Sequence, residues 1–166
     1  METEPRPPQP SKPGIRQAIS TDMRDLITLF LKHDVQFALC GGFAVSYYGF
    51  IRTTMDLDLL VYPSLENAER IMLALNEFGF GSAGIDKAAF CKRGTAITLG
   101  VQPNQIDLLT SMSSEDEKSV FSEIDTADIW GMRIPIVGKR ALLRAKREST
   151  RPRDRIDYDE LSNCES

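Results

Sequence analysis

The stretch Ala38–Tyr62, ALCGGFAVSYYGFIRTTMDLDLLVY, decides the fold that we expect for this chain. It starts within an apolar run, Val35–Leu39, that is typical of a short buried strand. Gly41-Gly42 then allows a sharp turn and a close approach of the backbone to a ligand, and Phe43–Tyr48 is long enough for one and a half helical turns. Because a helix after such a turn presents free backbone N–H groups, this junction favours a bound phosphate group.

Three aspartates follow on strand-like segments. In Met55–Val61, Asp56 and Asp58 are two residues apart, so in a strand both project from one face, with Cβ atoms roughly 6–7 Å apart. Asp107 lies in a second apolar segment, Gln105–Thr110. Mg²⁺ prefers oxygen ligands and usually takes one or two carboxylates together with substrate phosphates. The three acids therefore predict a metal-dependent phosphate site, although one such aspartate alone would more often only end a strand or face solvent.

The order of these residues resembles the nucleotidyltransferase superfamily that includes DNA polymerase β and the aminoglycoside and lincosamide nucleotidyltransferases. A fuller set is similar to small bacterial nucleotidyltransferases that include the abortive-infection toxins of toxin–antitoxin pairs: Gly41, Gly42, Ala44, Val45, Gly49, Arg52, Thr54, Asp56 and Asp58. A later block is similar to the C-terminal motif of the same proteins, with matches at Lys146, Arg151, Arg153, Asp154 and Asp157. The resemblance covers residues 35–162, with one departure, because many catalytic members carry Gly-Ser where this chain has Gly41-Gly42.

The resemblance implies an α+β nucleotidyltransferase fold, in which a mixed β-sheet is flanked by helices. It implies an enzyme that uses Mg²⁺ or Mn²⁺ to move a nucleoside monophosphate from an NTP to RNA, tRNA or a protein, with release of pyrophosphate. As a toxin, such an enzyme would have an antitoxin protein as a partner. In this interpretation Asp56, Asp58 and Asp107 are catalytic and bind the metal, and the nucleotide-binding residues are Gly41, Gly42, Arg52, Thr54, Lys146 and Asp154.

The C-terminal block also has a structural interpretation. Asp154 and Asp157 lie in or near the first turn of a helix, where the helix dipole favours acids without any catalytic role. Lys146, near the end of the preceding basic helix, is expected to reach a triphosphate with little importance for stability, whereas Arg140 is expected to face outward into solvent.

Two other functions remain open. The first is a non-catalytic nucleotide- or partner-binding module of the same fold, which the intact set of three aspartates disfavours, because a retired site would no longer need all three. The second is a small antibiotic nucleotidyltransferase. Enzymes of that kind generally carry additional C-terminal structure to hold the drug, and this chain ends soon after its basic helices.

Composition sets the remaining limits. The 166 residues, 42% hydrophobic and 27% charged, suit one domain over residues 17–163 after a Pro-rich tail, 1–16, that we expect to be disordered. A net charge of −4 argues against a basic nucleic-acid-binding domain. Three cysteines without metal-ligand spacing indicate a reducing compartment, and His33, the single histidine, excludes zinc sites built on histidine. Without a membrane-length apolar run or a signal peptide, we expect a cytoplasmic protein with no membrane partner.

Periodicity and turn residues predict the other elements. A helix capped by Ser20 or Thr21 should end near His33, and another should run from Ser64 to Gly79. The remaining predictions are strands at Ala88–Lys92 and Ala96–Val101, a short helix at Ser113–Phe121, two strand segments in Ala127–Val137, and helices at Lys139–Glu148 and after Pro152.

Overall fold

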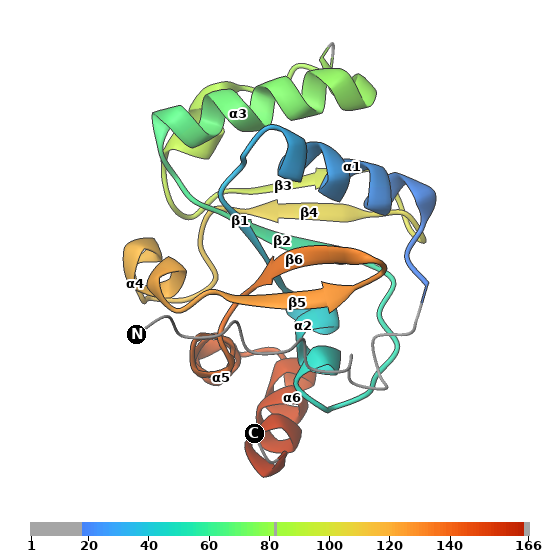
Figure 1. Cartoon of the computed structure of the whole chain (residues 1–166). Helices are drawn as coiled ribbons and strands as arrows, with labels where there is room; N and C mark the ends of the chain where they lie inside the picture. Colours follow the sequence, from blue (N-terminus) through green and yellow to red (C-terminus); the bar gives the residue numbers. More distant parts are fainter. Residues whose placement is uncertain (1–17, 82, 165–166) are drawn as a thin grey trace, which may run out of the picture.

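The chain forms a β-sheet with helices on both sides (Figure 1), in a computed structural model that describes residues 18–81 and 83–164. The predicted tail, 1–16, lies outside the described residues. The strands are β1 (Phe37–Cys40), β2 (Leu57–Val61), β3 (Ala96–Leu99), β4 (Ile106–Leu109), β5 (Asp125–Ile129) and β6 (Met132–Ile136). The helices are α1 (Thr21–Lys32), α2 (Gly41–Tyr47), α3 (Leu65–Leu75), the π-helical turn η2 (Asn76–Phe80), the 3₁₀ helix η3 (Lys87–Cys91), α4 (Glu117–Ser122), α5 (Lys139–Glu148) and α6 (Pro152–Asn163).

The sheet has the strand order β3-β4-β2-β1-β6-β5. Strand β2 pairs antiparallel with β1 and parallel with β4, and β1 pairs parallel with β6. The outer strands β3 and β5 pair antiparallel with β4 and β6. Helices α1 and α3 lie on one side of the sheet and α2, α5 and α6 on the other (Figure 1). The predicted α+β fold with a mixed, helix-flanked sheet is confirmed.

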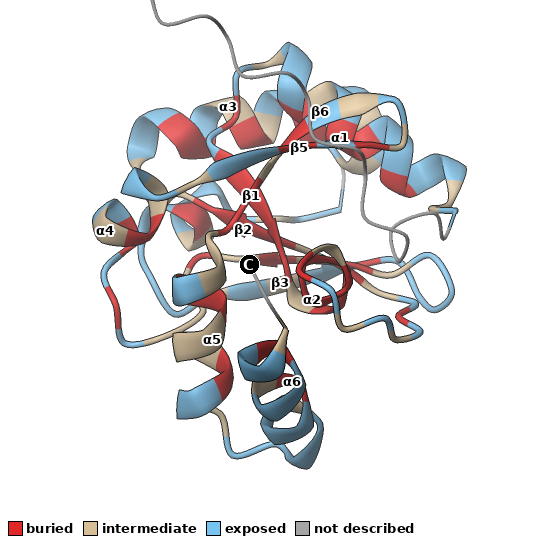
Figure 2. Ribbon diagram, turned by 60° about the horizontal axis from the view of Figure 1, so that its bottom comes forward, coloured by how far each residue is buried: buried red, intermediate tan, exposed pale blue. Residues whose placement is uncertain are grey.

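The central strands are buried because helices cover both of their faces. All four residues of β1 are buried, and only one residue of β2, Asp58, is partly exposed. The buried residues concentrate in these strands and on the inward faces of the helices (Figure 2). Burial of a Val, Leu or Phe side chain contributes about 1.5–3 kcal/mol, so this layer supplies the main stabilisation. The one partly exposed position in β2 is thus an acid.

Helix α1 has the termini that the sequence predicts. The Ser20 hydroxyl accepts a hydrogen bond from the Met23 N–H, which caps the first turn, and His33 follows the last turn. The buried residues recur every three or four positions: Met23, Leu26, Ile27 and Phe30. Within residues 18–81 and 83–164, no helix has both the length and the apolar character needed to span a membrane.

The predicted strand at Ala88–Lys92 is wrong, because this segment forms the 3₁₀ helix η3. The Asp86 carboxylate accepts a hydrogen bond from the Ala88 N–H at 3.0 Å and so starts a helical turn. Phe90 is fully buried, and η3 packs against α3. The tertiary contact of one aromatic side chain outweighs the strand pattern of its neighbours.

The acidic helix predicted at Ser113–Phe121 is shorter than expected. Helix α4 begins only at Glu117, because the side chain of Asp116 caps its first turn. Glu115, just before this cap, is buried and forms an ion pair with Arg140. Arg140, which we expected to face outward, is about half exposed and forms ion pairs with Glu115 and Glu123.

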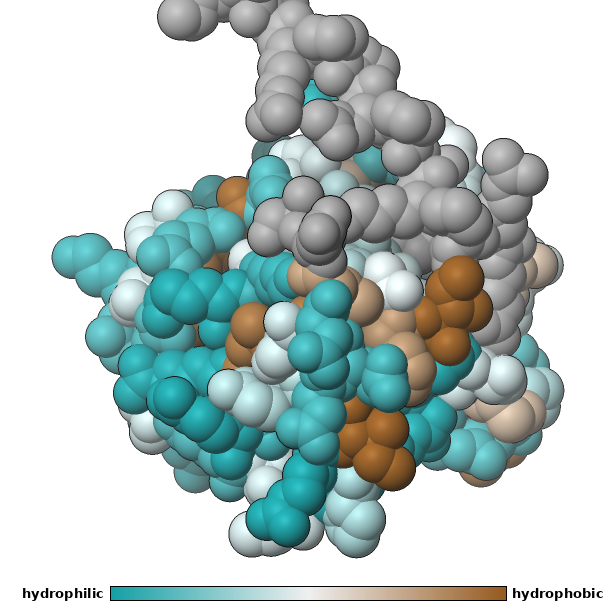
Figure 3. Space-filling view, turned by 90° about the horizontal axis from the view of Figure 1, so that it is seen from below, coloured by the Kyte–Doolittle hydropathy of each residue, from teal (hydrophilic) through white to brown (hydrophobic). Residues whose placement is uncertain are grey.

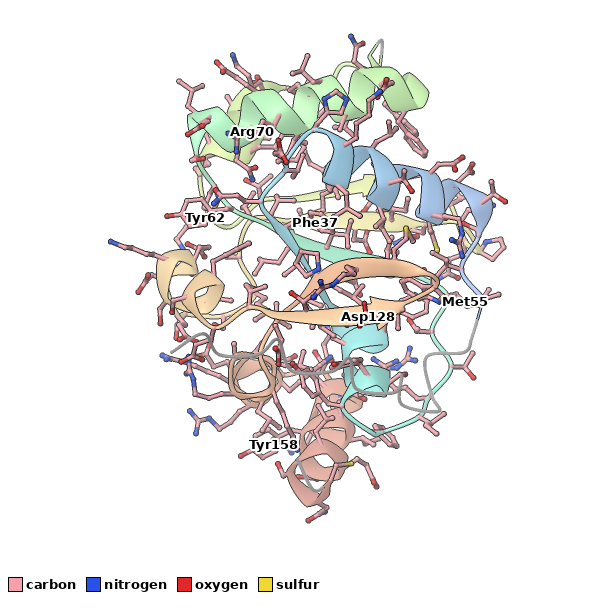
Figure 4. The ribbon with its side chains drawn as sticks, viewed as in Figure 1. Phe37, Met55, Tyr62, Arg70, Asp128 and Tyr158 are labelled. Atoms are coloured by element: carbon pink, nitrogen blue, oxygen red, sulfur yellow. The ribbon has the colours of Figure 1, made fainter. Side chains whose placement is uncertain are left out.

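Asn67 of α3 fixes the start of β1 against the end of β2. Its buried side chain accepts a hydrogen bond from the Gln36 N–H at 2.7 Å and donates to the carbonyls of Gln36 and Tyr62 at 3.0 and 2.9 Å. Nearby, Arg70 donates to the carbonyl of Asp34 at 3.2 Å; Figure 4 shows Arg70 and Tyr62 in this corner of the molecule. One side chain therefore satisfies three backbone groups at a strand crossover.

Asn67→Ala should lower the free energy of unfolding by about 2 kcal/mol, because it leaves buried backbone groups without partners. Urea unfolding measures this loss as a lower midpoint at an unchanged slope. The control is Asn76→Ala, an exposed position, which should cost less than about 0.5 kcal/mol. Equal midpoints for the two variants would contradict the assigned role of Asn67.

Candidate active site

The parallel register of β2 and β4 brings two of the predicted acids together. Asp58 is the direct partner of Asp107, and on its other side Asp58 faces Cys40 of β1. Asp56 precedes β2, which begins at Leu57 and not at Met55 as predicted. The acids therefore come from a strand pair and the loop before it.

Neutral donors hold two of these carboxylates. Thr98 of β3 donates its hydroxyl to Asp107 at 2.6 Å, and Gln105 donates its amide to the same carboxylate at 3.2 Å. Gln102, in the loop between β3 and β4, donates to Asp56 at 3.1 Å. Sequence reasoning missed these three partners, although Thr98 lies opposite Asp107 in a hairpin that the turn residues predict.

The carboxyl group of Asp58 has a raised pKa. The pKa of its carboxyl group is raised to about 7, chiefly by burial. The charges of Asp107 and Asp56 and a hydrogen bond with Asp107 add to this rise. The positive charge of Lys146 opposes these effects. Burial, and then the charge of Asp58, also raises the pKa of the neighbouring Cys40 thiol, which stays neutral. The three carboxylates of the site therefore repel one another more strongly than Lys146 compensates at Asp58.

Gly41 and Gly42 let the backbone pass close to the acids. Helix α2 begins at Gly41, two residues earlier than predicted, and Gly41 has a φ of +66°. A Cβ atom at Gly41 would overlap the Asp58 carboxylate, with Cγ at 2.7 Å. At Gly42 a Cβ would lie 2.7 Å from the Thr54 hydroxyl and 3.2 Å from Nη2 of Arg52. Both glycines are therefore required by contacts with predicted site residues.

The C-terminal block forms a buried network of ion pairs. Lys146 Nζ lies 2.8 Å from Oδ1 of Asp154 and 3.0 Å from Oδ2 of Asp157, and Ser149 also donates to Asp154. Arg52 binds the same Asp157 carboxylate. Lys146 is about 90% buried and pairs with the buried Asp157 and the partly exposed Asp154, so its loss should also lower stability, unlike the small effect expected from the sequence.

A cleft of about 460 Å³ joins the two halves of this site. Its walls include Cys40, Gly41 and Asp58 from the sheet side, and Lys146 and Asp154 from the helical hairpin α5–α6. Thr54 and Arg52 lie behind Gly42 instead. A second cavity of about 500 Å³, between α1, η2 and the β3–β4 loop, contains none of the three acids. The face seen from below is mostly hydrophilic with scattered apolar patches (Figure 3).

The acids suit a hard divalent cation by chemistry, but they are not arranged as a ready ligand set. Among the residues that the structure describes, no three His, Cys, Asp or Glu side chains are grouped as metal ligands. Asp56 and Asp107 point to the neutral donors given above. All three nevertheless offer carboxylate oxygens, and a cation would relieve the repulsion that raises the pKa of Asp58. Binding a cation requires these carboxylates to reorient.

Solved nucleotidyltransferases have the same fold. The lincosamide antibiotic adenylyltransferase LnuA, with lincomycin bound, matches with a TM-score of 0.52 and 13% identity over 89% of this chain and 99% of that one. A protein of Thermotoga maritima provisionally assigned as a nucleotidyltransferase matches with a TM-score of 0.57 and 12% identity, over 89% of this chain and 94% of that one. The antibiotic-resistance factor ANT(2'')-Ia matches with a TM-score of 0.54 and 12% identity, over 85% of this chain and 80% of that one. The chain therefore has the nucleotidyltransferase fold.

Comparisons by sequence add nothing to this assignment. No family model matches the chain, and no curated protein matches it. The predicted closeness to the abortive-infection toxins remains a prediction.

Gly41→Ala should destabilise the chain by about 3 kcal/mol, since it combines an unfavourable positive φ with displacement of the Asp58 carboxylate. The matched control is Gly94→Ala, where φ is +85° but a Cβ atom would meet nothing within 4 Å. That variant should lose only about 1 kcal/mol, from backbone strain. Urea unfolding of both variants measures the difference, and equal losses would contradict the close packing of Gly41 on Asp58.

Asp58→Asn should become more stable relative to the wild type as pH rises. The ordinary carboxyl pKa of 3.8 applies in the unfolded chain, whereas the folded value is about 7. Stability from protonated Asp58 is thus complete below about pH 4 and is lost as pH rises through about 7. The amide cannot lose this proton.

The difference in free energy of unfolding between Asp58→Asn and the wild type, measured with EDTA present, should shift by about 2–3 kcal/mol in favour of the variant between pH 5 and pH 8. Asp128→Asn, the same change at an exposed position of β5, is the control. A pH-independent difference for Asp58→Asn would contradict the burial and charge repulsion assigned to Asp58.

Proposed function

We propose that this chain is a divalent-metal-dependent nucleotidyltransferase, which moves a nucleoside monophosphate from an NTP to an acceptor hydroxyl and releases pyrophosphate. The observation that carries the proposal is the pairing of Asp58 with Asp107 in the sheet. Asp58 lies against Gly41 and lines a cleft that Lys146 also lines. The cleft volume of about 460 Å³ falls within the range of small-molecule sites, roughly 300–1,000 Å³.

The residues of the chain have distinct roles in this proposal. In the reaction the acceptor oxygen forms a bond to the α-phosphorus while the bond to pyrophosphate breaks, and the hydroxyl proton passes to Asp107. Gly41 and Gly42 admit the triphosphate at the start of α2, and Lys146 offsets its charge from the other wall. Thr54 and Arg52 support the turn from behind, and Asp154 orients Lys146.

Asp56, Asp58 and Asp107 would hold Mg²⁺ or Mn²⁺. A bound divalent cation supplies charge stabilisation for the attacking and leaving oxygens. Asp58 would offer its carboxylate oxygens at the wall of the cleft, beside Gly41. Asp56, which accepts a hydrogen bond from Gln102, would exchange it for the cation.

The acceptor class is the open part of the proposal. RNA, tRNA or a protein remains our expectation from the resemblance to toxin-type proteins, with an antitoxin as partner. LnuA binds lincomycin, and ANT(2'')-Ia has been solved with adenylyl-tobramycin. The fold match with LnuA, over 99% of the length of that enzyme, keeps an antibiotic acceptor as the second candidate.

The test is incubation of the full chain with Mg²⁺ and each α-labelled NTP, in the presence of total RNA, a protein lysate, or a panel of aminoglycosides and lincosamides. We expect label from a preferred NTP on one acceptor class, and loss of transfer in EDTA. Asp58→Asn and Asp107→Asn should each reduce transfer at least about a hundredfold, because each removes a charge that the reaction needs.

The control is Asp128→Asn on β5, the edge strand at the far end of the sheet from β3 and β4, which should transfer label like the wild type. NTP binding without transfer to any acceptor would favour the non-catalytic module. Equal transfer by Asp58→Asn and the wild type would exclude the proposed site.

A further inference from the structure

A single carboxylate on α6 contacts both cations of the candidate site. Asp157 is fully buried, with Oδ2 at 3.0 Å from Nη2 of Arg52 and at 3.0 Å from Nζ of Lys146. Its Oδ1 lies 2.9 Å from Nε of Arg52, an ion contact outside hydrogen-bond geometry. Arg52 and Asp157 are 105 residues apart in the sequence, so this contact ties the loop before β2 to the C-terminal hairpin.

Of the two cations that Asp157 contacts, Lys146 lines the cleft and Arg52 lies behind Gly42. Nη2 of Arg52 is 3.2 Å from the place of a Cβ on Gly42, so Arg52 supports the backbone of the Gly41-Gly42 turn. Lys146 lines the cleft across from Gly41. The side chains of Arg52 and Lys146 are only 15% and 10% exposed, which leaves them few alternative positions.

Asp157 itself is not among the described residues that line the cleft, whereas Asp154 is. It therefore acts on a ligand only through the cations. The network is balanced, because two cations meet two carboxylates, and this balance offsets the cost of burying Lys146 and Asp157. If Asp157 loses its charge, Arg52 loses the carboxylate that it contacts, and Lys146 keeps only Asp154.

We propose that Asp157 is a positioning residue, which sets the placement of Lys146 in the cleft and of the Gly41-Gly42 turn through Arg52, and thereby selects for the triphosphate part of the nucleotide. This inference rests on the proposed function and deepens it. A purely structural acid on α6 would stabilise the hairpin but would not distinguish nucleotides by their number of phosphates.

The test measures the affinity of the full chain for an NTP and for the corresponding nucleoside monophosphate, by titration calorimetry with Mg²⁺. Asp157→Asn keeps the side-chain shape and should raise the Kd for the NTP about tenfold while the Kd for the monophosphate changes less than twofold. Glu160→Gln, an exposed carboxylate on the same helix, is the control and should change neither value.

Equal changes for both nucleotides, or none, would overturn the positioning role while leaving the proposed function intact. Absence of NTP binding by the wild-type chain would overturn both. Circular dichroism at the assay temperature establishes that the variants are folded.

Arg52→Lys provides a second route if Asp157→Asn does not fold. It keeps the charge but loses the planar fork that binds the carboxylate, so it should show the same selective loss of NTP affinity. In the double variant the losses should be less than additive, because both changes break one contact. Full additivity, or an Arg52→Lys variant with wild-type NTP affinity, would overturn the inference.

Discussion

The register between β2 and β4 is the constraint on which the rest of the site depends. It sets Asp58 beside Asp107 in a mostly buried position, where burial first, and then repulsion by Asp107, raises the pKa of Asp58. Such an arrangement costs stability when both carboxylates are ionised, because like charges in a mostly buried position repel each other. The absence of a side chain at Gly41 follows from the same constraint, since the Asp58 carboxylate occupies that space. The pairing of β2 with β4 thus fixes both the position of Asp58 and the need for a glycine at position 41.

A second level of organisation connects the sheet with the C-terminal hairpin. Helices α5 and α6 pack on each other and line the cleft with Lys146 and Asp154, and Arg52 connects α6 to the loop before β2. Arg153 adds a hydrogen bond to the carbonyl of Thr53 at 2.9 Å. Segments about 100 residues apart therefore define one cleft. Because removing one member of a buried ion pair leaves an uncompensated charge, stability and ligand binding are coupled in Arg52, Lys146 and Asp157, and variants there need a readout that separates the two.

Much of this architecture could be predicted from local signals. The Gly-Gly turn, the apolar strands and the cap at Ser20 are encoded within a few residues of the elements they define, and the predicted elements follow. The strand predicted at Ala88–Lys92 failed because burial of Phe90 under α3 is a tertiary effect. For the same reason the sequence could nominate Lys146 as a phosphate ligand but could not show that Asp157 neutralises it. Spacing along the chain reports which residues share a strand or helix face, whereas ion pairs between distant segments depend on the complete fold.

The central claim is that Asp56, Asp58 and Asp107 together bind a divalent cation next to the Gly41-Gly42 turn. The most direct measurement is a crystal structure of the full chain with Mn²⁺ and a non-hydrolysable NTP analogue, with anomalous scattering used to locate the metal. The account predicts manganese within about 2.0–2.3 Å of carboxylate oxygens of Asp58 and at least one of the other two acids, with the triphosphate at the start of α2. Manganese bound elsewhere, with Asp58 still against Gly41 and no nucleotide in the cleft, would contradict it.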